Sequence, residues 1–374
     1  MRNTAVAESV VKRDAQAPSQ PAMTPRTSET SHIVALSAER YAEWDRYLSR
    51  HADATLFHTL AWRDAVREGF GHSDHYLAAL RGDRIVGVFP AFCIASRIAG
   101  RLLVSVPYGV GGGILADDGE AAGRLFDAAR RTARELGCAV IDLRSEKATA
   151  PDVPIVDRYV GFRRELPDRA EDVLSWLPRK ARAAARNARD KYQLTSHFNN
   201  EELALVWRLY SMSMRRLASL NYPLRFFEAL ASRFRDRHWV TVVRRNGQPV
   251  AGLVTFFFRD RVMPYFLGTT DEARRCSAAN FIYLAVMERA VAAGYRVFDF
   301  GRSRRDNGGS YDFKRFQGFE PRTLEYQRCV EPGCNAADLS PTNPAFGLAR
   351  RIWPHLPLCV TRFAGARLSR HIPG

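Results

Sequence analysis

Two stretches of the chain repeat in the same order, and this internal repeat limits the possible folds more than any other feature. HYLAALRGDRIVGVFPAF, which starts at His75, aligns with HWVTVVRRNGQPVAGLVTFFF, which starts at His238. RTARELGCAVIDLRS from Arg131 aligns with ERAVAAGYRVFDFGRS from Glu288 at nearly the same offset. Each half therefore predicts a hairpin, then a helix that leads into a strand, so we expect a duplicated α/β unit. The alternative is two unrelated segments of similar pattern.

The repeat also predicts the domain organisation. A chain of 374 residues is long enough for two domains that each bury a core. With a boundary near residues 166–172, we expect an N-terminal domain over residues 32–168 and a C-terminal domain over residues 169–335. Residues 1–31 contain much Ala, Ser, Thr and Pro and no apolar run, which predicts a disordered leader and not a signal peptide. Residues 336–374 are expected to form a basic extension.

Residues 296–326 are the first place to look for chemistry. Residues 296–300 alternate like a strand, and Gly301 allows a sharp turn after them. Residues 304–310 are typical of a polar, glycine-rich loop, and residues 311–316 alternate aromatic and charged side chains. Lysine and aspartate that are desolvated beside aromatic rings can move protons and stabilise developing charge. A hairpin with phenylalanines inside and charges outside would explain the same alternation without any function.

The charge of the chain favours anionic partners. The formal net charge is +16 and the sequence pI is about 10.0, which suits phosphates, tRNA, nucleotide-linked sugars or an anionic membrane face. In LPRKARAAARNARDKY, residues 177–192, a helix would place Arg179, Arg182 and Arg186 on one face and alanines on another. This stripe is either a solvated face or an anion-binding helix. Sequence-specific DNA binding is not expected, because the aromatic residues follow core periodicity.

The composition of the chain changes near its C-terminal end. Residues 345–371 contain no Asp or Glu, and arginines alternate there with apolar residues. The pattern is typical either of a tail lying on an anionic membrane surface or of a tail packed across a domain. The chain has no apolar run of about 18 residues, and its six scattered cysteines lack metal-binding spacing. We expect a cytoplasmic protein whose tail is the candidate for peripheral contact with the inner membrane face.

The DFGRS of residues 299–303, followed by GGSYDFKRFQGFEPRTLEY, resembles FemAB-type transferases, which contain two GNAT-like acyltransferase domains. PYGVGGGIL at residues 107–115, LPRKAR at residues 177–182 and the tail from NPAF to IPG are similar to FemAB-related proteins associated with exosortase/PEP-CTERM and exopolysaccharide systems. The resemblance covers about residues 33–374. It implies tandem domains with mixed sheets flanked by helices, an α/β (α+β) fold. It also implies amide-forming transfer of an acyl or aminoacyl group to an amine of a cell-envelope or exopolysaccharide precursor.

The resemblance and the residue types together suggest a set of site residues. Lys314 falls on the Phe-Lys motif of the family, whose lysine is expected to stabilise the oxyanion at the transferring carbonyl. By residue type, Asp312 or Asp299 is the candidate base and Tyr311 the candidate proton donor to the leaving group. The candidates for binding the acceptor, mostly through its phosphate or carboxylate, are Arg302, Ser303, Arg315, Tyr108, Gly111, Gly112, Arg144, Arg179, Arg182 and Arg186.

The sequence is compatible with more than one acyl donor. GNAT enzymes that use acyl-CoA usually bind its pyrophosphate with a glycine-rich loop at the start of a helix. Here that place reads Arg274-Arg275-Cys276-Ser277, without glycine, so Arg274, Arg275 and Ser277 are the candidate donor-binding residues. Acyl-CoA and aminoacyl-tRNA are both possible donor substrates, and no tightly bound cofactor or metal is expected. Two other hypotheses are aminoacyl-tRNA-dependent extension of a peptidoglycan peptide and non-catalytic binding of a polyanion or membrane.

Overall fold

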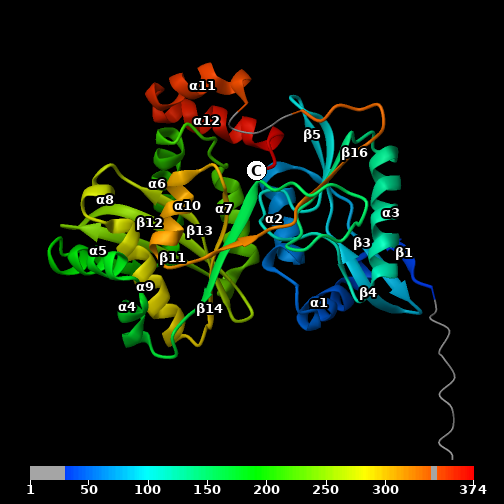
Figure 1. Cartoon of the computed structure of the whole chain (residues 1–374). Helices are drawn as coiled ribbons and strands as arrows, with labels where there is room; N and C mark the ends of the chain where they lie inside the picture. The colour runs from blue at the N-terminus through cyan, green and yellow to red at the C-terminus, as the bar shows by residue number, and fades with distance from the viewer. Residues whose placement is uncertain (1–29, 338–342) are drawn as a thin grey trace, which may run out of the picture.

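The structure has two domains, each built mainly from one half of the chain, and helices flank the sheets of both (Figure 1). The computed structural model describes residues 30–337 and 343–374. The predicted leader, residues 1–31, lies outside the described residues except for its last two positions. The mixed sheets and flanking helices confirm the predicted fold class.

The first domain contains two sheets. The four-stranded sheet has the order β1 (His32–Ala35), β3 (Leu77–Arg81), β4 (Arg84–Phe89) and β7 (Leu115–Ala116). The five-stranded sheet has the order β16 (Gln327–Val330), β8 (Val140–Leu143), β6 (Gly100–Val104), β5 (Phe92–Ser96) and β2 (Ser73–Asp74). The helices are α1 (Tyr41–Arg50), α2 (Leu60–Phe70) and α3 (Gly119–Glu135).

The second domain is built on one seven-stranded sheet. Its order is β10 (Thr195–Phe198), β11 (His238–Arg245), β12 (Gln248–Phe258), β13 (Arg261–Thr269), β14 (Val297–Arg304), β9 (Tyr159–Glu165) and β15 (Pro321–Thr323). The helices are α4 (Val173–Trp176), α5 (Arg179–Asp190), α6 (Leu203–Arg216), α7 (Leu224–Arg233), α8 (Glu272–Arg275), α9 (Ala278–Ala292) and α10 (Gly308–Phe316).

The two domains exchange a strand. β9 comes from the first half of the chain but pairs with β14 and β15 in the sheet of the second domain. β16 comes from the second half but pairs with β8 in the first domain. The sheets therefore do not divide at a single point of the sequence, and the boundary near residues 166–172 remains a prediction. The exchange ties the two domains together through main-chain hydrogen bonds.

The hydrophobic core is continuous across the domain interface. α2 of the first domain packs against α7 of the second, and the rings of Phe70 and Phe226 lie 4.8 Å apart between centroids. Gly69 permits this approach, because a Cβ atom there would lie 2.6 Å from Cδ2 of Phe226. Burial of large aromatic rings on both sides makes this interface resemble the interior of one domain.

Strands β13 and β14 separate soon after they meet. Their parallel pairing is limited to Arg261 with Val297 and Val262 with Phe298, at the start of each strand. On its other side, β14 pairs with β9 and shifts register between Asp299 and Arg302, where Gly301 has a φ of +65°. A β-bulge of this kind bends the strand and changes the direction of the next side chain. The bulge therefore decides where Arg302 points.

Residues 308–316 form the helix α10, so the hairpin interpretation of this segment is wrong. The side-chain carbonyl of Asn307 accepts a hydrogen bond from the Ser310 backbone at 3.4 Å and caps the helix. Buried Lys314 lies one turn after Ser310, and Gln317 is buried just after the helix, which gives the segment a helical inner face. Because aromatic and charged residues alternate closely in this segment, its helical periodicity is not evident from the sequence.

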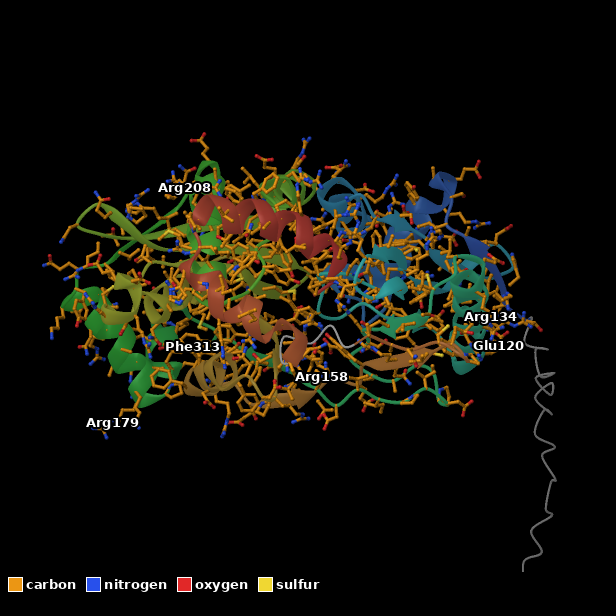
Figure 2. The ribbon with its side chains drawn as sticks, turned by 90° about the horizontal axis from the view of Figure 1, so that it is seen from above. Glu120, Arg134, Arg158, Arg179, Arg208 and Phe313 are labelled. Atoms are coloured by element: carbon orange, nitrogen blue, oxygen red, sulfur yellow. The ribbon has the colours of Figure 1, made fainter. Side chains whose placement is uncertain are left out.

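The tail forms two helices, α11 (Gly347–Ile352) and α12 (Leu358–Leu368), which lie side by side across the second domain (Figures 1 and 2). Thr361, Gly365 and Ser369 form the buried face of the tail around α12. A Cβ atom at Gly365 would lie 2.4 Å from Oδ1 of Asn221, so glycine lets the helix dock closely. None of the helices in the described part of the chain has the length and apolar character needed to cross a bilayer.

Candidate active site

A pocket of about 340 Å³ lies where the two domains meet. Its walls come from β8, from β14 and the start of α10, from the two exchanged strands, and from the last residues of the chain. The residues that line it include Asp142, Arg144, Tyr159, Arg302, Ser303, Ser310 and Tyr326. The structure thus brings together three predicted acceptor-binding residues, Arg144, Arg302 and Ser303. We call this cavity the interdomain pocket.

Arg302 follows the bulge of β14 and lies between two tyrosine rings. Its guanidinium carbon is 4.5 Å from the ring centre of Tyr159 and 5.6 Å from that of Tyr326. Tyr159 opens β9 and Tyr326 directly precedes β16, so the exchanged strands supply both rings. Within residues 30–337 and 343–374, no carboxylate forms an ion pair with Arg302. Its charge is therefore available to an anion in the pocket.

Arg144 is the counterpart of Arg302 in the first half of the repeat, because IDLRS aligns with FDFGRS. Its guanidinium lies 3.3 Å from the carboxylate of Asp142 and donates to the Pro373 carbonyl at 3.0 Å. Arg328 lies 3.7 Å from the same carboxylate. The charge of Arg144 is thus partly balanced inside the protein, whereas that of Arg302 is not.

Lys314 lies on α10 behind the bulge of β14 and is 8% exposed. Its Nζ donates to the carbonyls of Phe300 and Arg302 at 2.8 Å each and to that of Gly301 at 3.4 Å. Burial lowers the pKa of Lys314 to about 7, although the charge of Asp299 partly opposes this. The three ammonium hydrogens are used by the backbone, and the side chain is not part of the wall of the interdomain pocket.

The three predicted acid–base residues do not lie together. Asp299 accepts a hydrogen bond from the Gly301 backbone at 2.7 Å, and burial raises the pKa of its carboxyl group. Asp312 is exposed on α10. The ring of Tyr311 packs edge-on against Phe162 with 5.4 Å between centroids. Of the two candidate bases, Asp299, a residue of β14, is the one held in a desolvated environment.

Tyr108 is buried in the first domain. Its ring stacks on Phe70 with 3.8 Å between centroids, and its hydroxyl oxygen lies 2.9 Å from Nε2 of His72. Its backbone N–H donates to the Pro373 carbonyl at 2.8 Å, and its own carbonyl accepts a hydrogen bond from Tyr265 of the second domain. Tyr108 therefore positions the loop after β6, and its hydroxyl is already engaged.

Gly111 and Gly112 lie in the same loop and border a different cavity of about 190 Å³. The Gly112 backbone donates to the Arg144 carbonyl at 2.8 Å, and a Cβ atom there would lie 2.5 Å from Cγ1 of Val106. Close packing is thus a sufficient reason for glycine at this position. At Gly111 the nearest atom to an added Cβ, on Glu146, would be 3.6 Å away.

The other predicted residues lie away from the interdomain pocket. Arg179, Arg182 and Arg186 are on α5, whose alanines pack inward, and Figure 2 shows Arg179 far from the pocket residue Arg158. Arg315 is exposed on α10. Arg274 and Arg275 are exposed on α8, and Ser277, with a φ of +55°, begins α9.

Sequence reasoning missed several residues of the pocket, chiefly Asp142, Tyr159 and Tyr326. Asp142 could have been predicted, because the repeat aligns it with Asp299. Tyr159 and Tyr326 could not have been predicted, since their positions depend on the strand exchange, which no local pattern of the sequence indicates.

Comparisons with known proteins agree with this architecture. Residues 176–315 match the family model described as an acetyltransferase (GNAT) domain. FemX superposes with a TM-score of 0.61 at 12% sequence identity, over 85% of this chain and 100% of that one. A tandem GNAT protein from the clavulanic acid biosynthesis pathway gives a TM-score of 0.51 at 13% identity, over 82% of this chain and 100% of that one. A comparison with curated protein sequences finds no match.

The fold is therefore a tandem GNAT fold, as predicted, and residues 176–315 match the GNAT acetyltransferase domain model. The interdomain pocket is formed where the two GNAT-like units meet and is bordered by β14 of the matched domain. The match of residues 176–315 supports an acyltransferase of the GNAT type.

Proposed function

We propose that this protein is an N-acyltransferase that forms an amide on an amine of an anionic acceptor bound in the interdomain pocket. The observation that carries the proposal is Arg302, a cation on the pocket wall without a carboxylate partner among the residues described here. A guanidinium between two aromatic rings has a fixed plane and can bind a phosphate or carboxylate through two hydrogen bonds. Cell-envelope and exopolysaccharide precursors that carry an amino sugar and a phosphate fit this chemistry.

The reaction places defined demands on the site. The acceptor nitrogen forms a bond to the acyl carbon, and the bond from that carbon to its carrier sulfur or oxygen breaks. The ammonium of the acceptor must first lose a proton. Asp299 of β14, whose carboxyl pKa is raised by burial, is our candidate base, although its side chain borders a neighbouring cavity and not the interdomain pocket itself. The carrier leaves with a proton, for which Tyr311 stays the candidate donor. The separation of β13 from β14 provides the edge at which a donor can approach.

Lys314 has a different role in this proposal from the one that the family resemblance implies. Because Nζ is bonded to the carbonyls of residues 300, 301 and 302, we propose that Lys314 fixes the bulge and so aims Arg302 into the pocket. Lys314 is then a positioning residue, and stabilisation of the oxyanion falls to other groups or requires the ammonium to turn.

The donor is either acyl-CoA or an aminoacyl-tRNA. Exposed Arg274 and Arg275 precede the first turn of α9, and the positive end of the helix dipole favours anions there. A pyrophosphate and an RNA backbone would both suit this place. The basic stripe of α5 adds a second surface for an RNA donor.

The donor class can be tested with the purified protein and an anionic amino-sugar nucleotide as acceptor. Parallel reactions would contain a panel of acyl-CoAs or charged tRNA, with the product detected by mass spectrometry. An amide product supports the proposal, and the reaction that yields it identifies the donor. Charged tRNA combined with a peptidoglycan precursor peptide tests the related peptidoglycan hypothesis. Salt-sensitive polyanion binding without any turnover would favour the non-catalytic hypothesis.

A further inference from the structure

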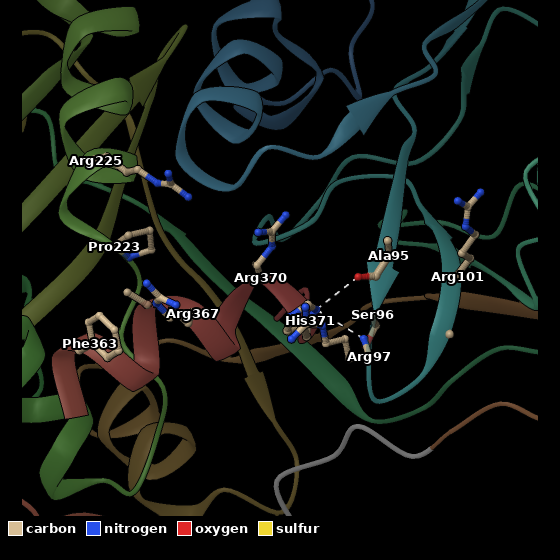
Figure 3. A pocket seen from close by; sticks show the side chains of 12 residues that line it. Ala95, Ser96, Arg97, Arg101, Pro223, Arg225, Phe363, Arg367, Arg370 and His371 are labelled. Carbon is tan, nitrogen blue, oxygen red and sulfur yellow. Dashed lines mark hydrogen bonds between the residues drawn. The ribbon is translucent and has the colours of Figure 1, made fainter. Parts of the chain in front are cut away.

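A second and larger cavity, of about 960 Å³, lies between α12 and the β5–β6 hairpin. Figure 3 shows its residues: Arg367 and Arg370 come from the tail, Arg225 from α7, and Arg97 and Arg101 from the hairpin. The Nδ1 atom of His371 lies 3.2 Å from the Ala95 carbonyl and thereby joins the tail to β5. We call this cavity the tail cavity. It is separate from the interdomain pocket in all of its lining residues.

The tail cavity is strongly cationic. Five arginines and one histidine line it, and none of the lining residues is acidic. In the described part of the chain, these five arginines form no ion pair with a carboxylate. Like charges gathered without counter-charges repel each other. Such a cluster is stabilised when an anion binds, and arginine is the side chain best suited to phosphate groups.

The face of α12 that borders this cavity is also apolar. Val360, Phe363 and Arg367 follow helical spacing on the exposed face of α12, opposite the face that packs on the second domain, and Arg370 follows just after the end of the helix. Phe363 is 63% exposed, and the Arg367 guanidinium carbon lies 4.4 Å from the centre of its ring. Two further large apolar side chains, Leu348 at 71% and Ile352 at 48%, are exposed on the neighbouring α11.

We propose that α11, α12 and the tail cavity form a docking surface for an anionic phospholipid membrane, with a lipid phosphate bound among the arginines of the cavity. A soluble phosphate would need the arginines but not the exposed apolar residues next to them. A lipid surface uses both, because apolar side chains enter the interface and arginines attract anionic head groups. The docked tail and the membrane contact are compatible, since they use opposite faces of α12.

Vesicle co-sedimentation of the full chain tests the proposal. One set of vesicles would be pure phosphatidylcholine and the other an equal mixture of phosphatidylcholine and phosphatidylglycerol. We expect binding to the anionic vesicles only. Arg367→Gln combined with Arg370→Gln should weaken that binding about 30-fold, because each interfacial arginine contributes about fivefold. Phe363→Ser should weaken it independently of charge.

The matched control is Arg131→Gln combined with Arg235→Gln, which also removes two positive charges, but from exposed positions outside the tail cavity. The control should bind like the wild type. Equal binding of the two double variants, or equal binding to both vesicle types, would overturn the proposal. Stabilisation by pyrophosphate in a thermal shift without vesicle binding would show a soluble ligand and would also overturn it. The assay needs no donor or acceptor, so its outcome is independent of the proposed enzymatic function.

Discussion

At the scale of single residues, the lysine of the Phe-Lys motif is hydrogen-bonded to the backbone of β14, in the sheet of the second domain. Three β14 carbonyls accept from Nζ of Lys314, and a fourth neighbour, the ring of Phe162, has its centre 5.3 Å away. A buried ammonium needs all of these partners, because desolvation of a charge is costly. The lysine of the motif therefore stabilises the conformation of β14, and its hydrogen bonds to the strand would have to break before it could contact a substrate.

The buried lysine leads to a prediction about pH. In the folded protein the pKa of Lys314 is about 7, whereas the ordinary value is 10.5, so between these values the unfolded chain binds more protons. Stability should therefore rise with pH from 7 to 10.5 in the wild type, relative to Lys314→Met. Chemical denaturation of both proteins at several pH values measures this difference. Parallel stability curves would contradict the assignment of a buried, destabilised ammonium.

Glycine in the loop after β6 gives a second residue-scale prediction. Gly112→Ala should lower the free energy of unfolding by about 1–3 kcal/mol, because the new methyl group would overlap Val106. The control is Gly123→Ala in α3, where an added Cβ meets nothing within 4 Å. That variant should gain about 0.5–1 kcal/mol, since alanine is a better helix former than glycine. If Gly112→Ala kept full stability but lost activity, the loop would instead serve the acceptor directly.

At the scale of elements, the sequence predicted most of what is local and missed what is tertiary. The repeat predicted the strand that contains Arg302 and the helix before it, and the stripe of arginines predicted the basic helix α5, because each element has its own periodicity. The segment of Lys314 was misinterpreted, since close alternation of aromatic and charged residues fits both a strand and one face of a helix. The exchange of β9 and β16 could not be predicted from the sequence. Both strands have the usual strand pattern, and the exchange lies only in which strands they pair with.

The exchanged strand β16 can be tested at its first residue. Gln327 is 1% exposed, and its amide oxygen accepts from the backbones of Thr149 at 2.8 Å and Ala150 at 3.0 Å. Its amide nitrogen donates to the carbonyls of Ala150 and Val153. Gln327→Leu should therefore cost roughly 3–6 kcal/mol, because several buried backbone groups lose their partner. Arg322→Ala on exposed β15 is the control, and a similar cost in both would contradict this role of Gln327.

At the scale of the whole molecule, duplication and exchange together explain the interdomain pocket. The repeat supplies two equivalent arginines, Arg144 and Arg302, and the domain arrangement brings both to one cavity. The two halves have diverged there, because Arg144 is paired with Asp142 whereas Arg302 lies between tyrosines. A tandem GNAT fold can in this way form a site between its units that neither unit could form alone.

The same arrangement predicts cooperative unfolding. The exchanged strands and the shared core of α2 and α7 leave no stable border between the domains. Calorimetry should show one thermal transition for the full chain, and Gln327→Leu should move that whole transition to lower temperature. Two separate transitions, with only one of them shifted by the variant, would show that the domains unfold independently.

Binding of the anionic acceptor by Arg302 can be tested by measuring the kcat/KM for amide formation in three proteins. Arg302→Gln should lower kcat/KM at least about tenfold, because hydrogen bonds to a charged group contribute about 1.5–3 kcal/mol. Arg322→Gln, which removes an exposed arginine outside the pocket, should match the wild type. Equal values for wild type and Arg302→Gln, with the fold of both intact, would show that Arg302 does not bind the acceptor.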